Sequence, residues 1–556
     1  MREGSTLHMS QSAKGQVTRQ AAFLMAAQMI SSVIGLLYRS PLHLLMGSEG
    51  DGYYQYAYEW YTIILLISSY SIPSAVSKVM AERLAVHEYR NAFKVFKAAL
   101  LYVLVVGGVG AAVAFFGAPF ILAKQPDAVL ALRVLAPTIM LSGFLGVFRG
   151  FFQAHNTMKP TAVSQVAEQI MNAVFSILMA YLLTRPYAGN PGLRGKFGAA
   201  GGTIGTGAGV VTGLVVMLLA WFVNRKMVSR RIARDRHEKE ESYQEVIRVS
   251  LLMCTPIILA TCVYNLTSVV DQVIFTNVIT GKGYTSAQVS ILYGIFGYRV
   301  KPIINIPIAL ASATSTALIP AVATSISRGS KKEAVSKIDE CIKMTLFISI
   351  PSAVGVAVLS YPVMFALYPG RAVTVEAAAQ LLSLGAVSVV FYSLSTVTNG
   401  VLQGLGRPSV PVRNAAAALG VNVAVLYVTT ALLNWHVYGI VVSILAYSMT
   451  VMILNALSVR KYVAYSHSVR QFAAPVKASV VMGAAVGAVY WIPKLLFGFI
   501  FSRYLASALL LVVSVLTGIV VYVLMYDRFA HLTDDELRRV PLGTRLLHLL
   551  RLLHLR

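Results

Sequence analysis

GFFQAHNTMKPT, residues 150–161, resembles GVLQGLGRPS, residues 400–409. The two stretches align Gln153 with Gln403 at an offset of 250 residues and Pro160 with Pro408 at an offset of 248. A second pair of segments, IPSAV at residues 72–76 and IPAVA at residues 319–323, has an offset of 247. Similar segments at nearly the same offset, with small insertions or deletions between them, are typical of a duplicated chain. The sequence therefore predicts two halves built on the same plan.

The segments around these motifs are apolar over lengths that cross a bilayer. Of the 556 residues, 57% are hydrophobic and only 12% are charged, about half the charged share of a soluble domain. A membrane-spanning helix takes about 20 apolar residues. We therefore expect an all-α, polytopic membrane protein of about fourteen spans: two duplicated six-helix lobes and two further C-terminal helices. The spans are expected to begin near Val17, Tyr54, Val95, Ala128, Thr161, Phe197, Val246, Val289, Ile338, Thr374, Pro408, Val437, Pro475 and Leu505.

The basic residues orient the chain, because they gather in alternate connections. Most of the 47 lysines and arginines lie on the side of the N-terminal tail, and the longest charged connection is 225–245. Because such residues stay on the cytoplasmic side, both termini are expected to be cytoplasmic. The predicted organisation is an N-terminal lobe at 1–224, a charged linker at 225–245, a C-terminal lobe at 246–465, two spans at 466–527 and a cytoplasmic amphipathic tail at 528–556. The tail ends in RLLHLLRLLHLR, which is expected to form an interfacial helix.

Composition argues against several function classes. The net charge of +25 lies between apolar runs, whereas a nucleic-acid-binding protein needs a basic soluble face with aromatic residues that stack on bases. The three cysteines, Cys254, Cys262 and Cys341, have no CxxC spacing, so neither a disulfide framework nor a metal site is expected. We expect no nucleic-acid partner, no metal and no cofactor.

Four basic residues fall inside or at the edge of expected spans: Arg39, Lys78, Arg299 and Lys301. An unpaired charge near a helix centre costs about 2.5 to 3.5 kcal/mol, so these side chains are candidates for a polar, substrate-binding cavity. The alternative for each is that its charged end reaches the nearest membrane interface.

The eighth expected span carries the most specific local signal, Tyr298 to Pro302. Pro302 has no N–H, so the carbonyl of Tyr298 lacks its helical partner, and Pro307 does the same to Ile303. Broken backbone at membrane depth is tolerated only against protein or a water-lined cavity. We therefore expect the helix to bend beside such a cavity.

Three acidic residues lie in expected spans: Glu59, Glu168 and Asp271. Each is a candidate coupling site or charge partner. Asp271, near Asn265 and Thr267, either binds Na⁺ or H⁺ as a coupling ion or pairs with a buried arginine, and we favour the pairing.

Three segments carry a family resemblance: FRGFFQAHNTMKPTAVSQVAEQIMNAV (148–174), IGLLYRSPL (34–42) and IPSAVSKVMAERL (72–84). They resemble the polysaccharide-exporter branch of the multidrug/oligosaccharidyl-lipid/polysaccharide superfamily. Within it, the chain is most similar to the stage V sporulation protein B and MurJ-like lipid II flippases of Gram-positive bacteria. Proteobacterial members carry an arginine in the first span; its nearest position here is Ser32, and Arg39 is the residue matched to it.

The resemblance implies a function. Members move undecaprenyl-pyrophosphate-linked glycans across the bacterial cytoplasmic membrane by alternating access, with a cationic cavity between two six-helix lobes. It also implies that the thirteenth and fourteenth spans form a groove for the polyprenyl tail. We expect a monomeric transporter whose partners are a lipid-linked glycan, with lipid II favoured, and the bilayer.

Three other functions compete with this one. An exporter of another lipid-linked polysaccharide unit shares the fold, as does a cation-coupled drug exporter, which would need an acidic cavity. The remote alternative is a membrane glycosyltransferase that holds a metal with Glu49 and Asp51 in the first outer loop. We instead interpret those two acids, between Gly50 and Gly52, as part of a solvated turn. We therefore expect a transporter and not an enzyme.

Overall fold

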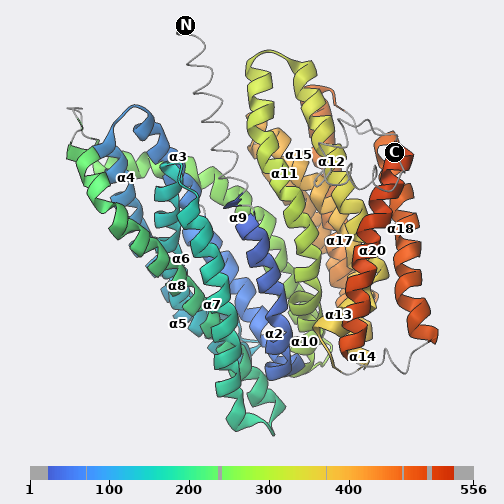
Figure 1. Cartoon of the computed structure of the whole chain (residues 1–556). Helices are drawn as coiled ribbons and strands as arrows, with labels where there is room; N and C mark the ends of the chain where they lie inside the picture. Colours follow the sequence, from blue (N-terminus) through green and yellow to red (C-terminus); the bar gives the residue numbers. More distant parts are fainter. Residues whose placement is uncertain are drawn as a thin grey trace. The chain divides into compact units, whose positions relative to one another are not determined.

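The computed structural model describes residues 23–24, 26–70, 72–233, 235, 241–370, 372–465, 469–496 and 504–530. Nearly all of these residues are helical, and no strand occurs among them (Figure 1). Packing divides the chain into two compact units, Met1–Tyr298 and Arg299–Arg556. The expected start of the first span at Val17 and the tail helix at 545–556 lie outside the described residues.

The first unit begins with helix Ala26–Leu37. Its other helices are α2 (Arg39–Leu65), α3 (Ile72–Ala85), α4 (Tyr89–Tyr102), α5 (Gly108–Ile121), α6 (Val129–Ala154), α7 (Lys159–Thr184), α8 (Pro191–Ala233), α9 (Tyr243–Gly281) and α10 (Ser286–Gly294).

The second unit contains α11 (Lys301–Ser327), α12 (Lys331–Val358), α13 (Ser360–Leu367), α14 (Ala372–Ala386), α15 (Ser388–Gly404), α16 (Ser409–Tyr427), α17 (Val437–Val463), α18 (Val469–Leu496) and α20 (Tyr504–Ala530).

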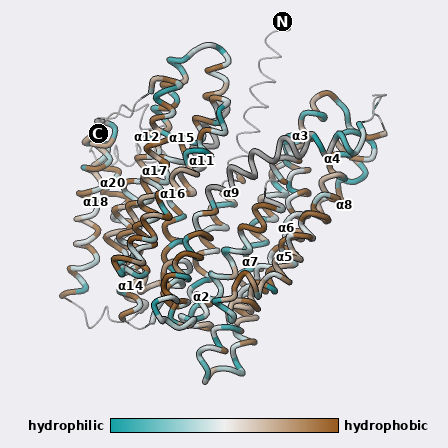
Figure 2. The backbone as a smooth tube through the Cα atoms, turned by 180° about the vertical axis from the view of Figure 1, so that it is seen from behind, coloured by the Kyte–Doolittle hydropathy of each residue, from teal (hydrophilic) through white to brown (hydrophobic). Residues whose placement is uncertain are grey.

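The helices have the length and apolarity of membrane spans. Among the described residues, 10 are long and apolar enough to cross a bilayer, or up to 11 if the bent pair Ala26–Leu37 and Arg39–Ser68 is one span. The helices α5, α6 and α17 are hydrophobic along most of their length (Figure 2). The protein is therefore a helical, multi-pass membrane protein, and the count of about fourteen spans stays a prediction.

Glycines let α8 approach α7 closely. A side chain at Gly201 would place its Cβ 2.6 Å from the backbone of Ala180, and one at Gly209 would lie 2.6 Å from the carbonyl oxygen of Glu168. Small residues at four-residue spacing are typical of tightly packed membrane helices. This packing fixes the rotation of α7 and therefore the direction of its polar face.

The turns that end α6 and α15 share one backbone geometry. The N–H of Asn156 donates to the carbonyl of Gln153, and the N–H of Gly406 donates to the carbonyl of Gln403, both at 2.9 Å. Asn156 and Gly406 have φ values of 55° and 71°, as the left-handed residue that commonly ends a helix does. The two repeated sequence motifs thus form the same kind of turn.

Prolines lie at three helix starts. Pro160 is in the first turn of α7, Pro408 directly precedes α16, and Pro302 is in the first turn of α11. Proline is favoured there because the first N–H groups of a helix have no intrahelical partner. A π-helical segment, Ile295–Val300, separates α10 from α11, so the expected irregularity at Pro302 is an interruption of the α-helix.

The expected solvated turn at Glu49 and Asp51 is wrong. The chain reverses at Gly47, where φ is 74°, and residues 48–52 are helical. Asp51 is fully buried, and its carboxylate lies 2.9 Å from Nδ1 of His43. A buried carboxylate needs a polar partner, and His43 is that partner here.

The boundary between the packed units differs from the expected lobe boundary. The units divide after Tyr298, within the eighth expected span, whereas the sequence placed the division at the charged linker 225–245. The first unit thus holds α9 and α10 in addition to residues 1–224. The organisation of the chain into duplicated lobes stays a prediction.

Candidate functional site

A polar pocket of about 360 Å³ lies in the first unit. Four helices line it: the helix Ala26–Leu37, α2, α6 and α7. Most of its lining side chains are polar or charged, and we call it the polar pocket. It is lined by Gln28, Ser31, Ser32, Gly35, Tyr38, Arg39, Tyr58, Arg149, Gln165, Glu168, Gln169 and Asn172.

The polar residues of α7 share one face of the helix. Gln165, Glu168, Gln169 and Asn172 follow the three- and four-residue spacing that places side chains on the same side. The helix Ala26–Leu37 contributes Gln28 and its neighbours at the same spacing. Two polar stripes therefore line the pocket within otherwise apolar helices.

Arg149 and Glu168 form an ion pair in the pocket wall. Nη2 of Arg149 donates to Oε2 of Glu168 at 2.7 Å, and its Nε donates to Oγ of Ser164 at 3.0 Å. The two side chains are 15% and 22% exposed. The pair holds the guanidinium at the pocket surface while leaving part of it accessible.

Arg39 is bound to Tyr298 in three ways. Nη1 of Arg39 donates to the carbonyl of Tyr298 at 2.9 Å, and the hydroxyl of Tyr298 donates to the carbonyl of Arg39 at 3.0 Å. The guanidinium also lies 4.9 Å from the centroid of the Tyr298 ring. The carbonyl that Pro302 deprives of its helical partner thus accepts from an arginine of the pocket.

Several polar atoms in the pocket wall have no hydrogen-bond partner in the part of the chain that the structure describes. They are Oγ of Ser31, Oε1 of Gln165 and Oε1 of Gln169. A buried polar group without a partner costs about 1 to 3 kcal/mol. Ligand hydroxyl or amide groups that donate to these oxygens would recover that cost.

The arrangement suits an anionic, hydroxyl-rich ligand. Two guanidinium groups and one carboxylate give the polar pocket a formal charge of +1, and four amide side chains surround them. Tyr54 and Tyr58 stack with ring centroids 5.7 Å apart, and Tyr58 lines the pocket. Among the described residues no group of three or more histidine, cysteine or acidic side chains could hold a metal ion. Charge, amides and an aromatic face are therefore the recognition elements available.

The structure brings together two of the predicted site residues, Arg39 and Glu168, in the polar pocket. Lys78 lies exposed on α3. Arg299 and Lys301 belong to the second unit, where Arg299 is 1% exposed and its guanidinium lies 5.9 Å from the centroid of the Tyr368 ring.

The other two predicted acids lie elsewhere in the first unit. Glu59 on α2 accepts a hydrogen bond from Nε2 of Gln55 at 2.8 Å. Asp271 on α9 is 2% exposed. Both carboxylates lie within electrostatic range of Tyr293. Their role as coupling sites or charge partners stays a prediction.

Sequence reasoning missed Arg149 and the amides of α7. A span of about 20 residues that begins near Ala128 ends before Arg149 and puts it in the cytoplasmic connection that follows, whereas α6 extends to Ala154 and holds Arg149 within the helix. The available signal was the spacing of Gln165, Glu168 and Gln169, since a polar stripe in an apolar span predicts a lined cavity.

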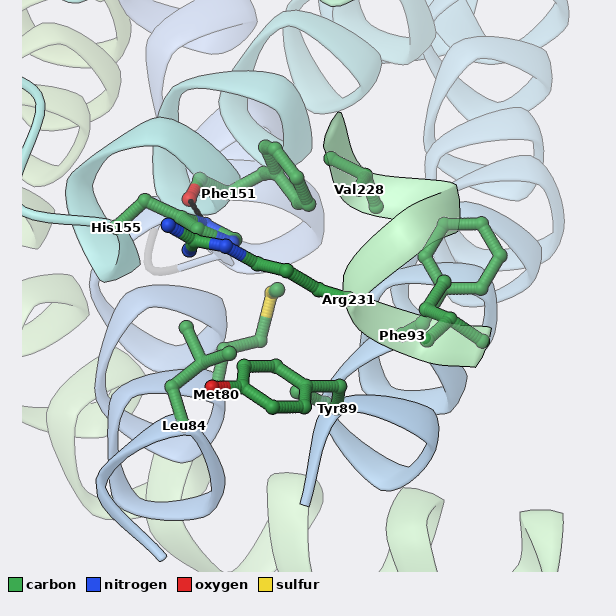
Figure 3. A pocket seen from close by; sticks show the side chains of 10 residues that line it. Met80, Leu84, Tyr89, Phe93, Phe151, His155, Val228 and Arg231 are labelled. Atoms are coloured by element: carbon green, nitrogen blue, oxygen red, sulfur yellow. Dashed lines mark hydrogen bonds between the residues drawn. The ribbon is translucent and has the colours of Figure 1, made fainter. Parts of the chain in front are cut away.

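A much smaller pocket of about 10 Å³ lies beside the turn between α6 and α7 (Figure 3). His155 and Arg231 both line it, and Nδ1 of His155 lies 2.9 Å from the carbonyl of Phe151. Because a carbonyl only accepts, Nδ1 carries the proton. Burial lowers the pKa of His155, and the nearby charge of Arg231 lowers it further, against a rise from the Phe151 hydrogen bond. His155 is therefore neutral at pH 7.

The depressed pKa of His155 predicts an acid-sensitive stability. The unfolded chain binds a proton near pH 6.5 while the folded chain still excludes it, so the free energy of unfolding falls as the pH drops below about 6.5. Thermal unfolding of the detergent-solubilised protein between pH 7.5 and 5.5 measures this, and His155→Gln is expected to reduce the slope. An unchanged slope in that variant would contradict the assignment.

Comparisons with known proteins identify proteins that are similar to this chain. The model of the polysaccharide biosynthesis protein family matches residues 17–325, and the MatE model matches residues 256–428. The lipid II flippase MurJ of Bacillus subtilis (strain 168) is 25% identical over 528 residues, which cover 92% of this chain and 95% of that protein. Stage V sporulation protein B of the same organism is 20% identical over 543 residues, covering 96% and 99%. A solved lipid II flippase MurJ in an inward closed conformation superposes with a TM-score of 0.64 at 15% identity, covering 91% of this chain and 98% of that one.

Proposed function

The chain belongs to the polysaccharide biosynthesis protein family, and from this premise we propose that it is a flippase for an undecaprenyl-pyrophosphate-linked glycan. The substrate moves from the cytoplasmic to the outer leaflet of a bacterial cytoplasmic membrane by alternating access. Lipid II is the favoured substrate, because the similarity to a lipid II flippase extends over nearly the whole chain.

The observation that supports this proposal most is the composition of the polar pocket. A diphosphate needs fixed positive partners, and guanidinium groups bind such oxygens with charge-assisted hydrogen bonds. Sugar hydroxyls both donate and accept, as the amides of Gln165, Gln169 and Asn172 also do. Arg39 and Arg149 thus suit the diphosphate, and the polar face of α7 suits the glycan.

The charge of the polar pocket argues against a drug exporter for cationic compounds. The MatE match raises that alternative. A cationic substrate needs an uncompensated carboxylate, but Glu168 is already bound to Arg149 at 2.7 Å, and Arg39 adds a further positive charge to the pocket.

A rescue experiment tests the proposed function. The lipid II flippases of a bacterial host are depleted, the chain is expressed, and growth is recorded together with lipid II exposed on the outer surface. Return of both supports the proposal. Inserted protein that restores neither, and that fails to move purified undecaprenyl-pyrophosphate glycans in vesicles, would contradict it.

Membrane potential is expected to drive the transport. A diphosphate carries about two negative charges, and moving each outward from the negative side yields about 2.3 kcal/mol per 100 mV, or roughly 4.6 kcal/mol in all. Reconstituted vesicles with a K⁺ diffusion potential and no sodium gradient measure the effect. Flipping that ignores the size and the sign of the potential would refute this prediction.

A further inference from the structure

A second pocket lies in the first unit, on another face of α2. It has a volume of about 230 Å³ and is bounded by α2, the C-terminal end of α5 with the loop that follows it, and α9. Tyr56 and Trp60 line it, whereas Tyr58 lines the polar pocket. Side chains two positions apart on a helix point in different directions. We call this space the lateral pocket, and it is separate from the proposed transport site.

Two anchored glutamines form the polar part of the wall, and each is 1% exposed. Oε1 of Gln125 accepts from the hydroxyls of Ser286 and Ser290 at 2.8 and 2.7 Å. Nε2 of Gln272 donates to the carbonyl of Tyr56 at 3.2 Å.

These bonds leave one amide nitrogen and one amide oxygen unused. Nε2 of Gln125 and Oε1 of Gln272 have no hydrogen-bond partner among the described residues. Because the other end of each amide is fixed, the unused groups are identified. A ligand hydroxyl satisfies both requirements, since it accepts from the first amide and donates to the second.

The rim of the lateral pocket is exposed and partly apolar. Phe120, at the end of α5, is 85% exposed, and Val273 on α9 is 40% exposed. Lys124 lies in the loop that follows α5 and is exposed on the same rim. An apolar rim beside a lysine where spans end is the environment of a lipid head group.

The size of the lateral pocket limits which lipid head groups can fit in it. The volume of about 230 Å³ is more than ten times the roughly 10 to 15 Å³ that a single water needs. A glycerol phosphate head group fits this volume, whereas the glycan of a peptidoglycan precursor is far larger. Choline head groups carry no hydroxyl for Gln272.

We propose that the lateral pocket binds an anionic phospholipid with a hydroxylated head group, of which phosphatidylglycerol is the simplest. Lys124 binds the phosphate, Gln125 and Gln272 bind the glycerol hydroxyls, and an acyl chain lies along Phe120. This lipid holds the ends of α2, α5 and α9 together and is not the transported molecule.

Native mass spectrometry of the full-length protein tests the proposal. The protein is equilibrated with equal amounts of phosphatidylglycerol, phosphatidylethanolamine and phosphatidylcholine. We expect retained phosphatidylglycerol to exceed phosphatidylcholine, and the double variant Lys124→Ala, Gln272→Leu to lose at least tenfold of it. The matched control, Lys282→Ala with Gln244→Leu, replaces an exposed lysine and an exposed glutamine and is expected to retain the lipid.

Lys124→Glu provides a second variant that preserves both glutamines. It too is expected to lose phosphatidylglycerol, with thermal unfolding as the check on folding. Equal retention in the double variant and its control, retention without preference between the phospholipids, or retention of only an added undecaprenyl-pyrophosphate glycan would overturn the proposal. Because the readout is binding of a bulk lipid, it is independent of the transported substrate.

Discussion

Replacing Arg149 with methionine is expected to lower transport by at least tenfold. Methionine keeps much of the side-chain volume but removes the partner of Glu168, so the formal charge of the polar pocket changes from +1 to 0. A hydrogen bond to a charged group contributes about 1.5 to 3 kcal/mol, and 1.4 kcal/mol corresponds to a factor of ten. The diphosphate then loses one of its two positive partners and meets the unpaired carboxylate of Glu168. Flipping in reconstituted vesicles measures the loss.

A second substitution at the Arg149–Glu168 ion pair distinguishes this electrostatic explanation from misfolding. Adding Glu168→Gln to Arg149→Met returns the pocket to +1, so the double variant is expected to recover a substantial part of the transport. Arg133→Met is the matched control, because Arg133 is an exposed arginine on the same helix. A double variant as inactive as Arg149→Met, with both proteins folded, would remove the electrostatic role of the pair.

Replacing Arg39 with alanine is expected to have a similarly large effect, on stability as well as on transport. The variant removes a positive charge from the polar pocket and leaves the carbonyl of Tyr298 without its donor, which costs about 1 to 3 kcal/mol. Arg39→Lys keeps the charge but cannot both lie over the Tyr298 ring and reach its carbonyl with a planar fork. We expect an intermediate loss in the lysine variant, measured as flipping rate and melting temperature.

The Arg39 prediction has its own control. Tyr298→Phe removes only the hydroxyl bond to the carbonyl of Arg39 and keeps both the ring and the accepting carbonyl. It is expected to change transport less than threefold, as is Arg185→Ala at an exposed position. If Arg39→Ala transports like either control, Arg39 does not act in the pocket.

The sequence predicted the fold well where periodicity and proline chemistry decide it. Long apolar runs predicted the spans, and the family resemblance and the helical membrane fold are confirmed. The missing N–H of Pro302 predicted an orphaned carbonyl at Tyr298, because that inference needs only the helical hydrogen-bond pattern. Its partner, Arg39, lies 259 positions away along the chain, and no local rule connects the two.

The candidate site was only partly predictable from the sequence. The rotation of each helix about its own axis decides which side chains face the pocket, and this rotation depends on packing against other helices. Glu168 was recognised as an acid within a span, but its partner Arg149 was placed in a connection, since a span boundary shifts by several residues without changing the apolar count. Asp51 shows the reverse error: Gly50 and Gly52 suggested a solvated turn, whereas the helix continues through them. A would-be Cβ at Gly52 lies 2.5 Å from the carbonyl carbon of Ser290, so this glycine serves close packing.

The most direct measurement places a photo-crosslinking amino acid at position 169 and identifies what it captures. Gln169 lies in the wall of the polar pocket, and Val163, 52% exposed on the same helix, provides the matched position outside it. After illumination of membranes that are actively transporting, mass spectrometry identifies the adducts. The account predicts an undecaprenyl-pyrophosphate glycan attached at position 169 and only bulk phospholipid at position 163. A transport-competent protein that captures no such glycan at position 169, or captures it equally at both positions, would contradict the claim that the head group occupies this pocket.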